Sequence, residues 1–228
     1  MRLEDLNWMD VEHYLETDDR IILISGATEQ HAYLSLLTDI LIPSRLALAV
    51  AEREKVLIAP PLNFGFSKIF TEYPGTISLT RNTFELVMLE IFEGLLHQGF
   101  RGFFFMNGHG GNQLPARLHD FMEDSEIRIT WYDWWRSPAV RNFEARHDLV
   151  LNHANWGENF PFNRVAECPI DEKPVVDTTE LTTVYSARAV LGDGNFGGLY
   201  QVRDELMHEL FAMVADEATA LVRAMRRP

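Results

Sequence analysis

Ile21-Ile22-Leu23-Ile24-Ser25 is a continuous apolar run, and the polar segment Gly26-Ala27-Thr28-Glu29-Gln30-His31 follows it directly. A run of this length closed by a glycine is typical of a strand buried on both faces of a parallel sheet. A second such run, residues 102–106, leads into Asn107-Gly108-His109-Gly110-Gly111-Asn112. Ligands of open parallel sheets bind beyond the carboxyl ends of the strands. We therefore expect both polar segments to converge on one site.

Helical and extended patterns alternate around these two runs. Asn82 is the expected N-cap of the clearest helix, because Glu85 follows three residues later and apolar residues then recur at helical spacing up to Gly99. Helices are also expected over 44–55, 114–122 and 202–225, and strands over 56–59 and 128–134. Residues 137–200 are irregular enough to hold active-site loops. The pattern predicts an α/β fold over residues 1–228, a single three-layer domain with a central, mostly parallel sheet flanked by helices.

The charge balance excludes one broad class of function. The chain has 20 basic and 34 acidic residues, a formal net charge of -14. A protein that neutralises nucleic-acid phosphates needs a dense basic face, so no nucleic-acid partner is expected. The hydrophobic content of 46% with 24% charged residues is enough for a core and excludes a disordered chain.

Cysteine and hydropathy patterns favour a cytoplasmic protein. Cys168 is the single cysteine, so no intrachain disulfide can form. The amino-terminal residues lack a basic start followed by an apolar run, and no apolar stretch approaches the roughly 20 residues that span a bilayer. We expect a cytoplasmic location and no membrane partner.

Four chemistry-bearing side chains follow the two buried strands: Glu29, His31, Asp39 and His109. Each one alone has an ordinary explanation, such as a surface acid, a helix cap or a hydrogen-bonded turn residue. Together they change the interpretation, because carboxylates and imidazoles buried at strand ends are costly unless a divalent metal compensates. A phosphate-binding turn at 108–111 is the weaker interpretation, since both the dinucleotide glycine pattern and a Walker lysine are missing.

Two further segments complete the pattern. His153 and Glu158 lie in the irregular region, within His153-Ala154-Asn155-Trp156-Gly157-Glu158, and are weak evidence by themselves. Pro74-Gly75-Thr76-Ile77-Ser78-Leu79 has no ionisable side chain and is interpreted as an architectural turn.

In this order the segments resemble the creatininase family of metal-dependent amidohydrolases. The resemblance covers most of residues 20–160, with a looser match over 192–205. It implies an α/β fold, two divalent metal ions (Zn, Mn or Fe), hydrolysis of a non-peptide amide bond in a small-molecule substrate, and frequently a homo-oligomer, a hexamer built as a trimer of dimers.

The resemblance also implies roles for individual residues. Glu29, His31, Asp39 and His109 match the family's metal ligands, with Asp39 in the bridging position. Creatininase has a further glutamate where this chain has Gly111, and Glu158 is the natural replacement ligand. Three carboxylates, two divalent cations and a bridging hydroxide sum to zero charge, -3 + 4 - 1. His153 matches the position of the proton donor for the leaving amine, a role for which Glu158 competes if it does not bind metal.

Two departures from the family pattern concern the substrate pocket. Ala32-Tyr33-Leu34 stands where the family has a Gly and a second His, and Ile69 and Phe70 replace a Glu-His pair. These changes argue against any familiar substrate and leave the expected ligands intact. Four tryptophans are weighed as lining for a flat ring, although tryptophan is more often a core residue: Trp131, Trp134, Trp135 and Trp156.

The resulting hypothesis is a metal-dependent hydrolase that cleaves the C–N bond of a small cyclic amide, lactam or formamide with a hydroxide shared between the two metals. One alternative is a catalytically degenerate metal-binding subunit with a structural or regulatory role. A less favoured one is a dinuclear phosphoesterase, since few Arg or Lys residues lie near the motifs.

Overall fold

The computed structural model describes residues 1–181 and 184–227. Residues 182, 183 and 228 of the predicted domain lie outside the described residues. Four parallel strands form one sheet in the order β2-β1-β3-β4, which confirms the predicted α/β class. Their bounds are β1 (Arg20–Ser25), β2 (Leu57–Ile58), β3 (Gly102–Asn107) and β4 (Arg128–Asp133).

The strand register aligns polar side chains at the carboxyl edge of the sheet. Ser25 pairs with Asn107, and Asn107 pairs with Asp133. The Ser25 hydroxyl donates to Asn107 Oδ1 at 2.9 Å, and Asn107 Nδ2 donates to Asp133 Oδ1 at 2.8 Å. These three hydrogen-bonded side chains lie at the carboxyl edge of the sheet, where the loops after β1 and β3 begin.

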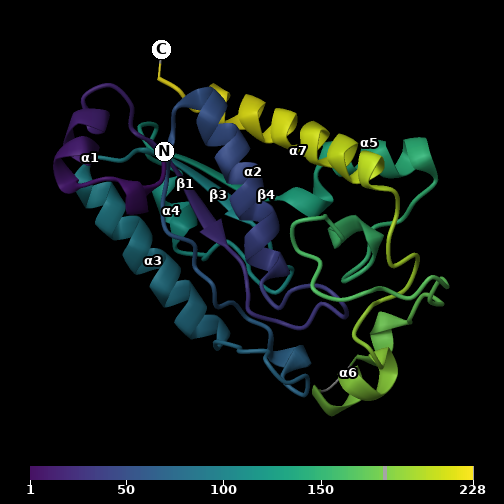
Figure 1. Cartoon of the computed structure of the whole chain (residues 1–228). Coiled ribbons are helices and arrows are strands. Elements are labelled where there is room, and N and C mark those ends of the chain that lie inside the picture. The colour runs from purple at the N-terminus through teal and green to yellow at the C-terminus, as the bar shows by residue number, and fades with distance from the viewer. Residues whose placement is uncertain (182–183, 228) are drawn as a thin grey trace.

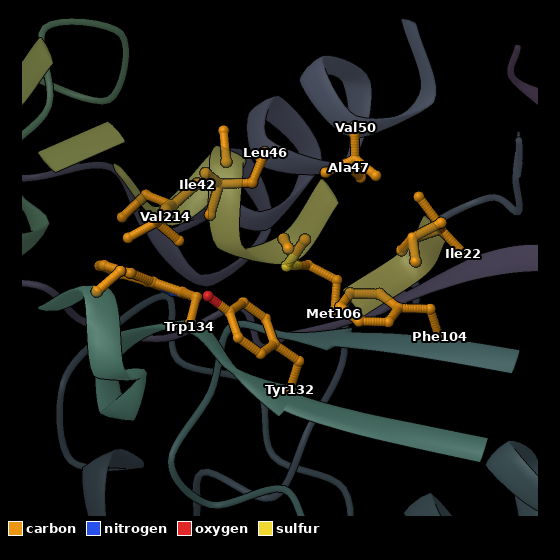
Figure 2. Packing of buried hydrophobic residues seen from close by; sticks show 14 of the residues in the cluster. Ile22, Ile42, Leu46, Ala47, Val50, Phe104, Met106, Tyr132, Trp134 and Val214 are labelled. Atoms are coloured by element: carbon orange, nitrogen blue, oxygen red, sulfur yellow. The ribbon is translucent and has the colours of Figure 1, made fainter. Parts of the chain in front are cut away.

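One face of the sheet packs on three helices, α2 (Thr38–Glu54), α5 (Pro138–His147) and α7 (Asp204–Ala224). Figure 2 shows Phe104, Met106 and Tyr132 from the strands facing Leu46 of α2 and Val214 of α7. Alternation along each strand explains the arrangement, because every second side chain points to the same face.

The other face packs on α1 (Trp8–Leu15), α3 (Arg81–Gln98) and α4 (Leu118–Phe121). Leu23, Phe103 and Phe105 lie in this second cluster, with Phe92 of α3. In Figure 1, α1 and α3 lie on the opposite side of the sheet from α2 and α7, so the expected three layers are present.

Several predicted element bounds were wrong. The first long helix begins at Thr38 rather than residue 44, because Pro43 is accommodated inside its second turn. Thr80, and not Asn82, caps α3: the Thr80 side chain accepts from the Thr83 backbone N–H. The helix expected over 114–122 is reduced to α4, and the strand expected over 56–59 to two residues.

The region 137–200 is less irregular than expected, since it contains α5 and α6 (Val184–Leu191). Ser137 caps α5 and Pro138 occupies its first turn, which is a start signal that the sequence did carry. The described residues also form short 3-10 turns: η1 (Leu3–Asp5), η2 (Lys68–Phe70), η3 (Trp134–Arg136), η4 (Trp156–Glu158) and η5 (Thr178–Glu180). Within the described ranges, no helix has the length and apolar character needed to cross a bilayer.

Candidate metal centre

Four of the predicted residues meet at the carboxyl edge of the sheet. Glu29 and His31 come from the loop after β1, Asp39 from the first turn of α2, and His109 from the loop after β3. Their exposed fractions are 1%, 1%, 3% and 5%, respectively. The structure therefore brings together, out of water, side chains that are up to 80 residues apart, from residue 29 to residue 109.

Asp39 lies between the two imidazoles. Its Oδ1 is 2.9 Å from His31 Nε2, and its Oδ2 is 2.8 Å from His109 Nδ1. These contacts are short but poorly aligned: His31 Nε2 and Asp39 Oδ2, with Glu29 Oε2, are buried without a hydrogen-bond partner among the described residues. Buried polar atoms of this kind are costly, and a cation among them would satisfy all three.

The second nitrogen of each imidazole is already engaged by a carbonyl. His109 Nε2 donates to Phe66 O at 3.0 Å, and His31 Nδ1 donates to the backbone carbonyl of Glu29 at 3.2 Å. A carbonyl only accepts, so the proton of each neutral ring is on that nitrogen. In the neutral form of each ring, the unprotonated nitrogens are therefore His109 Nδ1 and His31 Nε2, which face Asp39.

Among the described residues, the donor atoms fall into three sets: Glu29, His31 and His153 form one, and the other two share Asp39. Glu29, Asp39 and His109 form the second set, and His31, Asp39 and Glu158 form the third, with the atoms of each set within 4.8 Å of one another. Glu158 Oε2 lies 3.8 Å from His31 Nε2 and accepts from the Ala154 N–H at 2.6 Å. Two neighbouring sets joined by one carboxylate suit a pair of divalent cations.

The electrostatics of the cluster favour positive charge. Burial alone would lower the pKa of His31, but the charge of Asp39, assisted by Glu158 and Glu29, raises it to about 10. Burial also opposes protonation of His109, yet Glu29 and Asp39 raise its pKa to about 9. The positive charge of two protonated imidazoles thus balances the buried carboxylates, as bound metal cations would.

The same surroundings shift the pKa values of the three carboxyl groups in different directions. Burial raises the pKa of Glu29, and it raises that of Glu158 to about 7. Burial acts on Asp39 as well, but the charges of His31 and His109 outweigh it and hold the Asp39 pKa below its ordinary value. Asp39, at the centre of the cluster, is the carboxylate that most strongly keeps its charge.

Glycines allow the close approach of the strand ends to α2. A Cβ on Gly26 would lie 2.2 Å from the Asp39 carbonyl oxygen, and one on Gly108 would lie 2.0 Å from it. That carbonyl receives no helical hydrogen bond, because Pro43 four residues later has no N–H. Both loops can therefore press against the first turn of α2 and surround the Asp39 side chain.

The backbone at Gly111 has no room for a glutamate side chain. A Cβ at this position would lie 2.1 Å from Phe66 O and 2.4 Å from His109 Nε2. A glutamate there would displace His109 from its carbonyl partner. Glu158, from the turn η4, provides the carboxylate instead.

His153 lies beside the cluster, with Nδ1 3.9 Å from Glu29 Oε1 and its ring stacked on Phe70 at 4.9 Å. Burial, with the charge of His31, lowers its pKa well below the ordinary value. Gln30 Nε2 lies 2.9 Å from His153 Nε2 and also donates to Gly194 O, while Gln30 Oε1 accepts from Ala32 N–H. The Gln30 amide is oriented by these partners, so the His153 proton is on Nδ1, toward Glu29.

A cavity of about 630 Å³ opens onto the cluster. Ile69 and Phe70 line it, as expected for residues that depart from the family pattern at the pocket. Trp135 also lines it, whereas Trp134 and Trp156 are buried in the core beneath α5 and α7. The fourth tryptophan, Trp131, packs against the core on the other face of the sheet.

Six lining residues were not anticipated: Arg136, Arg141, Glu144, Leu151, Asn152 and Phe196. All of them except Arg136 belong to residues 137–200, the region expected to be irregular. No motif marks them, because only the packing of α5 and of the loops around it brings them to the cavity.

The family assignment now has a direct test. A family model described as creatininase, creatinine amidohydrolase, matches residues 4–222. The chain belongs to the creatininase family. This match confirms the family that the sequence motifs indicated.

Curated relatives match parts of the chain. Creatinine amidohydrolase of Pseudomonas putida is 27% identical over 154 residues, covering 60% of this chain and 59% of that protein. Mycofactocin precursor peptide peptidase of Mycolicibacterium smegmatis is 33% identical over 99 residues, 40% of each. 3-Dehydro-scyllo-inosose hydrolase of Thermotoga maritima is 25% identical, over 57% of this chain and 44% of that protein. The matches thus span well under two thirds of these relatives.

Solved structures share the fold over nearly their whole length. Creatinine amidohydrolase (creatininase) superposes with a TM-score of 0.76 at 19% identity, covering 100% of this chain and 98% of the other. A structure named creatininase Mn gives 0.76 at 20% identity, covering 100% and 99%. A creatininase variant described as Zn-Zn type gives 0.77 at 19% identity, covering 100% and 98%. These neighbours support the three-layer α/β architecture.

Proposed function

We propose that this chain is a metal-dependent hydrolase that cleaves the C–N bond of a small cyclic amide, lactam or formamide. The observation that carries the proposal is the buried carboxylate of Asp39 with one imidazole at each oxygen, at 2.9 and 2.8 Å. Membership of the creatininase family supports the same chemistry. The creatinine amidohydrolase of Pseudomonas putida makes an amide the first substrate class to test.

The proposed ligands are Glu29, Asp39 and His109 for one ion and His31, Asp39 and Glu158 for the other. Zn, Mn and Fe all accept such mixed nitrogen and oxygen ligands. When bound, the pair of ions supplies an activated water and a Lewis acid for the amide carbonyl. The backbone carbonyls that hold His31 and His109 keep both imidazoles in the tautomer that binding requires.

His153 is the proposed group that passes a proton to the leaving nitrogen. Burial and the charge of His31 lower its pKa, so the resting ring is neutral and first accepts the proton that it then donates. Its Nδ1–H faces the cluster, and Phe70 and Gln30 hold the ring in place. Glu158 is the competing candidate, because its pKa near 7 allows it to carry a proton if it does not bind metal.

The proposal is tested with metal-free protein that is reloaded with Zn²⁺, Mn²⁺ or Fe²⁺ and offered lactams, cyclic amides, formamides and phosphate esters. We expect release of an amine or opening of a ring with at least one metal, and no turnover with chelator. Asp39→Asn should abolish this activity, whereas Asp120→Asn, an exposed acid on α4, should retain it. Full occupancy by metal without turnover on any substrate would favour the degenerate metal-binding subunit, and turnover of esters alone would favour the phosphoesterase.

Four further predictions remain to be tested. They are a single domain over residues 1–228, a homo-oligomer built as a hexamer, a small-molecule substrate and a cytoplasmic location. The first is supported by α1 and α7, helices from opposite ends of the chain that pack on the two faces of one sheet.

A further inference from the structure

Two arginines line the cavity that opens onto the candidate metal centre. Arg136 ends the turn η3 directly after β4, and Arg141 lies on the first turns of α5. From this placement we infer that the substrate carries a carboxylate, which Arg136 and Arg141 bind while its amide group faces the metals. The inference rests on the proposed hydrolase function and names the substrate class within it.

The two guanidinium groups are available for a ligand. Within residues 1–181 and 184–227, neither arginine has a carboxylate within 4.0 Å. Arg141 Nη1 donates to the backbone carbonyl of Arg136, which ties the two residues together. A guanidinium has five N–H donors in a planar fork that matches a carboxylate, so most of these donors are free.

The carboxylates nearest in the chain already accept from other groups. Glu144, which lines the same cavity, accepts from the Leu151 backbone N–H at 2.6 Å. Asp133 accepts from Asn107 Nδ2 at 2.8 Å and from Trp131 Nε1 at 2.9 Å. Both carboxylates are therefore engaged by N–H donors, and neither forms an ion pair with Arg136 or Arg141 among the described residues.

The charges around the cavity favour an anion once metal is bound. Two divalent cations bring +4 against -3 from Glu29, Asp39 and Glu158, and the arginines add +2. Glu144 contributes -1 and the hydroxide of the proposed mechanism another -1, so the lining sums to 4 - 3 + 2 - 1 - 1, or +1, in a protein whose formal charge is -14. A local positive field in an acidic protein selects anionic over neutral amides.

The test compares acids with matched alcohols. The probes are 5-oxoproline and N-formyl amino acids, each paired with the analogue in which hydroxymethyl replaces the carboxylate. For the metal-loaded protein we expect kcat/KM to favour the acid over its alcohol by at least about tenfold. The double substitution Arg136→Gln/Arg141→Gln should reduce that ratio by about tenfold or more. Arg117→Gln, which removes an exposed arginine outside the cavity, should leave the ratio unchanged.

Binding of the same probes, measured by calorimetry, separates this inference from the proposed function. Hydrolysis without preference for acids, or a preference that persists in the double variant, overturns the carboxylate subsite and leaves the hydrolase standing. Absence of turnover, with acids bound about tenfold more tightly by the parent than by the double variant, overturns the hydrolase and supports the subsite. Equal binding by both proteins overturns the subsite whether or not turnover occurs.

Discussion

Asp39 is the side chain around which the candidate centre is organised. It is the acid whose pKa is held low in a pocket that raises those of Glu29 and Glu158, since both imidazoles touch it. The lowered pKa therefore keeps the Asp39 carboxylate charged at neutral pH. A charged carboxylate between the imidazole nitrogens of His31 and His109 suits the binding of two metal cations.

His109→Ala is expected to remove metal and activity together. The substitution deletes Nδ1, which lies 2.8 Å from Asp39 and 3.5 Å from Glu29. Metal content per chain, measured by elemental analysis, should fall by at least one ion, and turnover by about a hundredfold or more. His119→Ala, on the exposed side of α4, is the control. Full occupancy in the His109 variant would show that the ligand assignment is mistaken.

His153→Ala is expected to separate metal binding from turnover. Gln30 engages His153 Nε2, and His153 Nδ1 is 3.9 Å from Glu29. His153 also belongs to a candidate ligand set with Glu29 and His31, so the variant distinguishes a proton donor from a ligand. Turnover should fall by about 10²–10⁴ with metal content unchanged. Wild-type rates would eliminate the proton-donor role, and loss of an ion would make His153 a ligand.

Metal binding should release protons. In the metal-free protein the pKa values of about 10 and 9 keep His31 and His109 protonated at pH 7. A metal needs the same nitrogens unprotonated, so metal affinity should rise with pH up to about 10, the higher of the two pKa values, and fall as pH decreases. Calorimetry in buffers of different ionisation enthalpy should detect about two protons released per chain at pH 7. Release of fewer than about half a proton would contradict the proposed imidazole ligands.

Among the secondary-structure elements, α2 and α3 show how local signals succeed and fail. The periodicity of α3 predicted the helix correctly, whereas the expected cap, Asn82, lies two residues after the observed cap, Thr80. The helix expected to begin at residue 44 begins at Thr38 and carries Pro43, a residue that normally interrupts helices, in its interior. Here the carbonyl that Pro43 leaves free is the one that faces Gly26 and Gly108.

The cap of α3 can be tested by a pair of substitutions. Thr80→Ala removes the oxygen that accepts from the Thr83 N–H at 3.2 Å, so the free energy of unfolding should fall by about 1 kcal/mol. Asn82→Ala should change it by less than about 0.5 kcal/mol, because its side chain does not cap the helix. Urea unfolding monitored by circular dichroism measures both. The reverse order of effects would restore Asn82 as the cap.

Across the whole molecule, Arg20 links the two ends of the chain to the sheet. It is 1% exposed, pairs with Asp18 at 2.7 Å and Glu54 at 3.4 Å, and donates to Val222 O at 2.9 Å. Burial is the largest influence on the Asp18 pKa and raises it, but the hydrogen bonds and charge of Arg20 outweigh it and leave the pKa lowered. β1, α2 and α7 therefore share one buried ionic contact.

Arg20→Met should destabilise the protein by about 3 kcal/mol, because it leaves the buried Asp18 carboxylate without its partner, whereas Glu54 keeps its pair with Arg223 at 2.8 Å. Arg53→Met, which breaks an exposed pair with Asp216, should cost less than about 1 kcal/mol. Thermal and urea unfolding give both values. Equal costs would show that the Arg20 network is not the tie between the layers.

The sequence by itself determined the class of fold, the family and the first candidate ligands. Buried parallel strands are continuous apolar runs, and polar residues at their carboxyl ends mark a site, so Glu29, His31 and His109 could be recognised from local order alone. The glycines at 26 and 108 likewise stand beside the chemistry they permit.

Only the tertiary structure decided which atoms meet. His31 lies 3.8 Å from Glu158, 127 residues later, because sheet order and the packing of η4 bring the two loops together. Arg136 and Arg141 reach the cavity through the placement of α5, which no motif announces. The physical reason is that period and turn chemistry are properties of short segments, whereas burial, pKa and charge balance depend on neighbours that the chain supplies from far away.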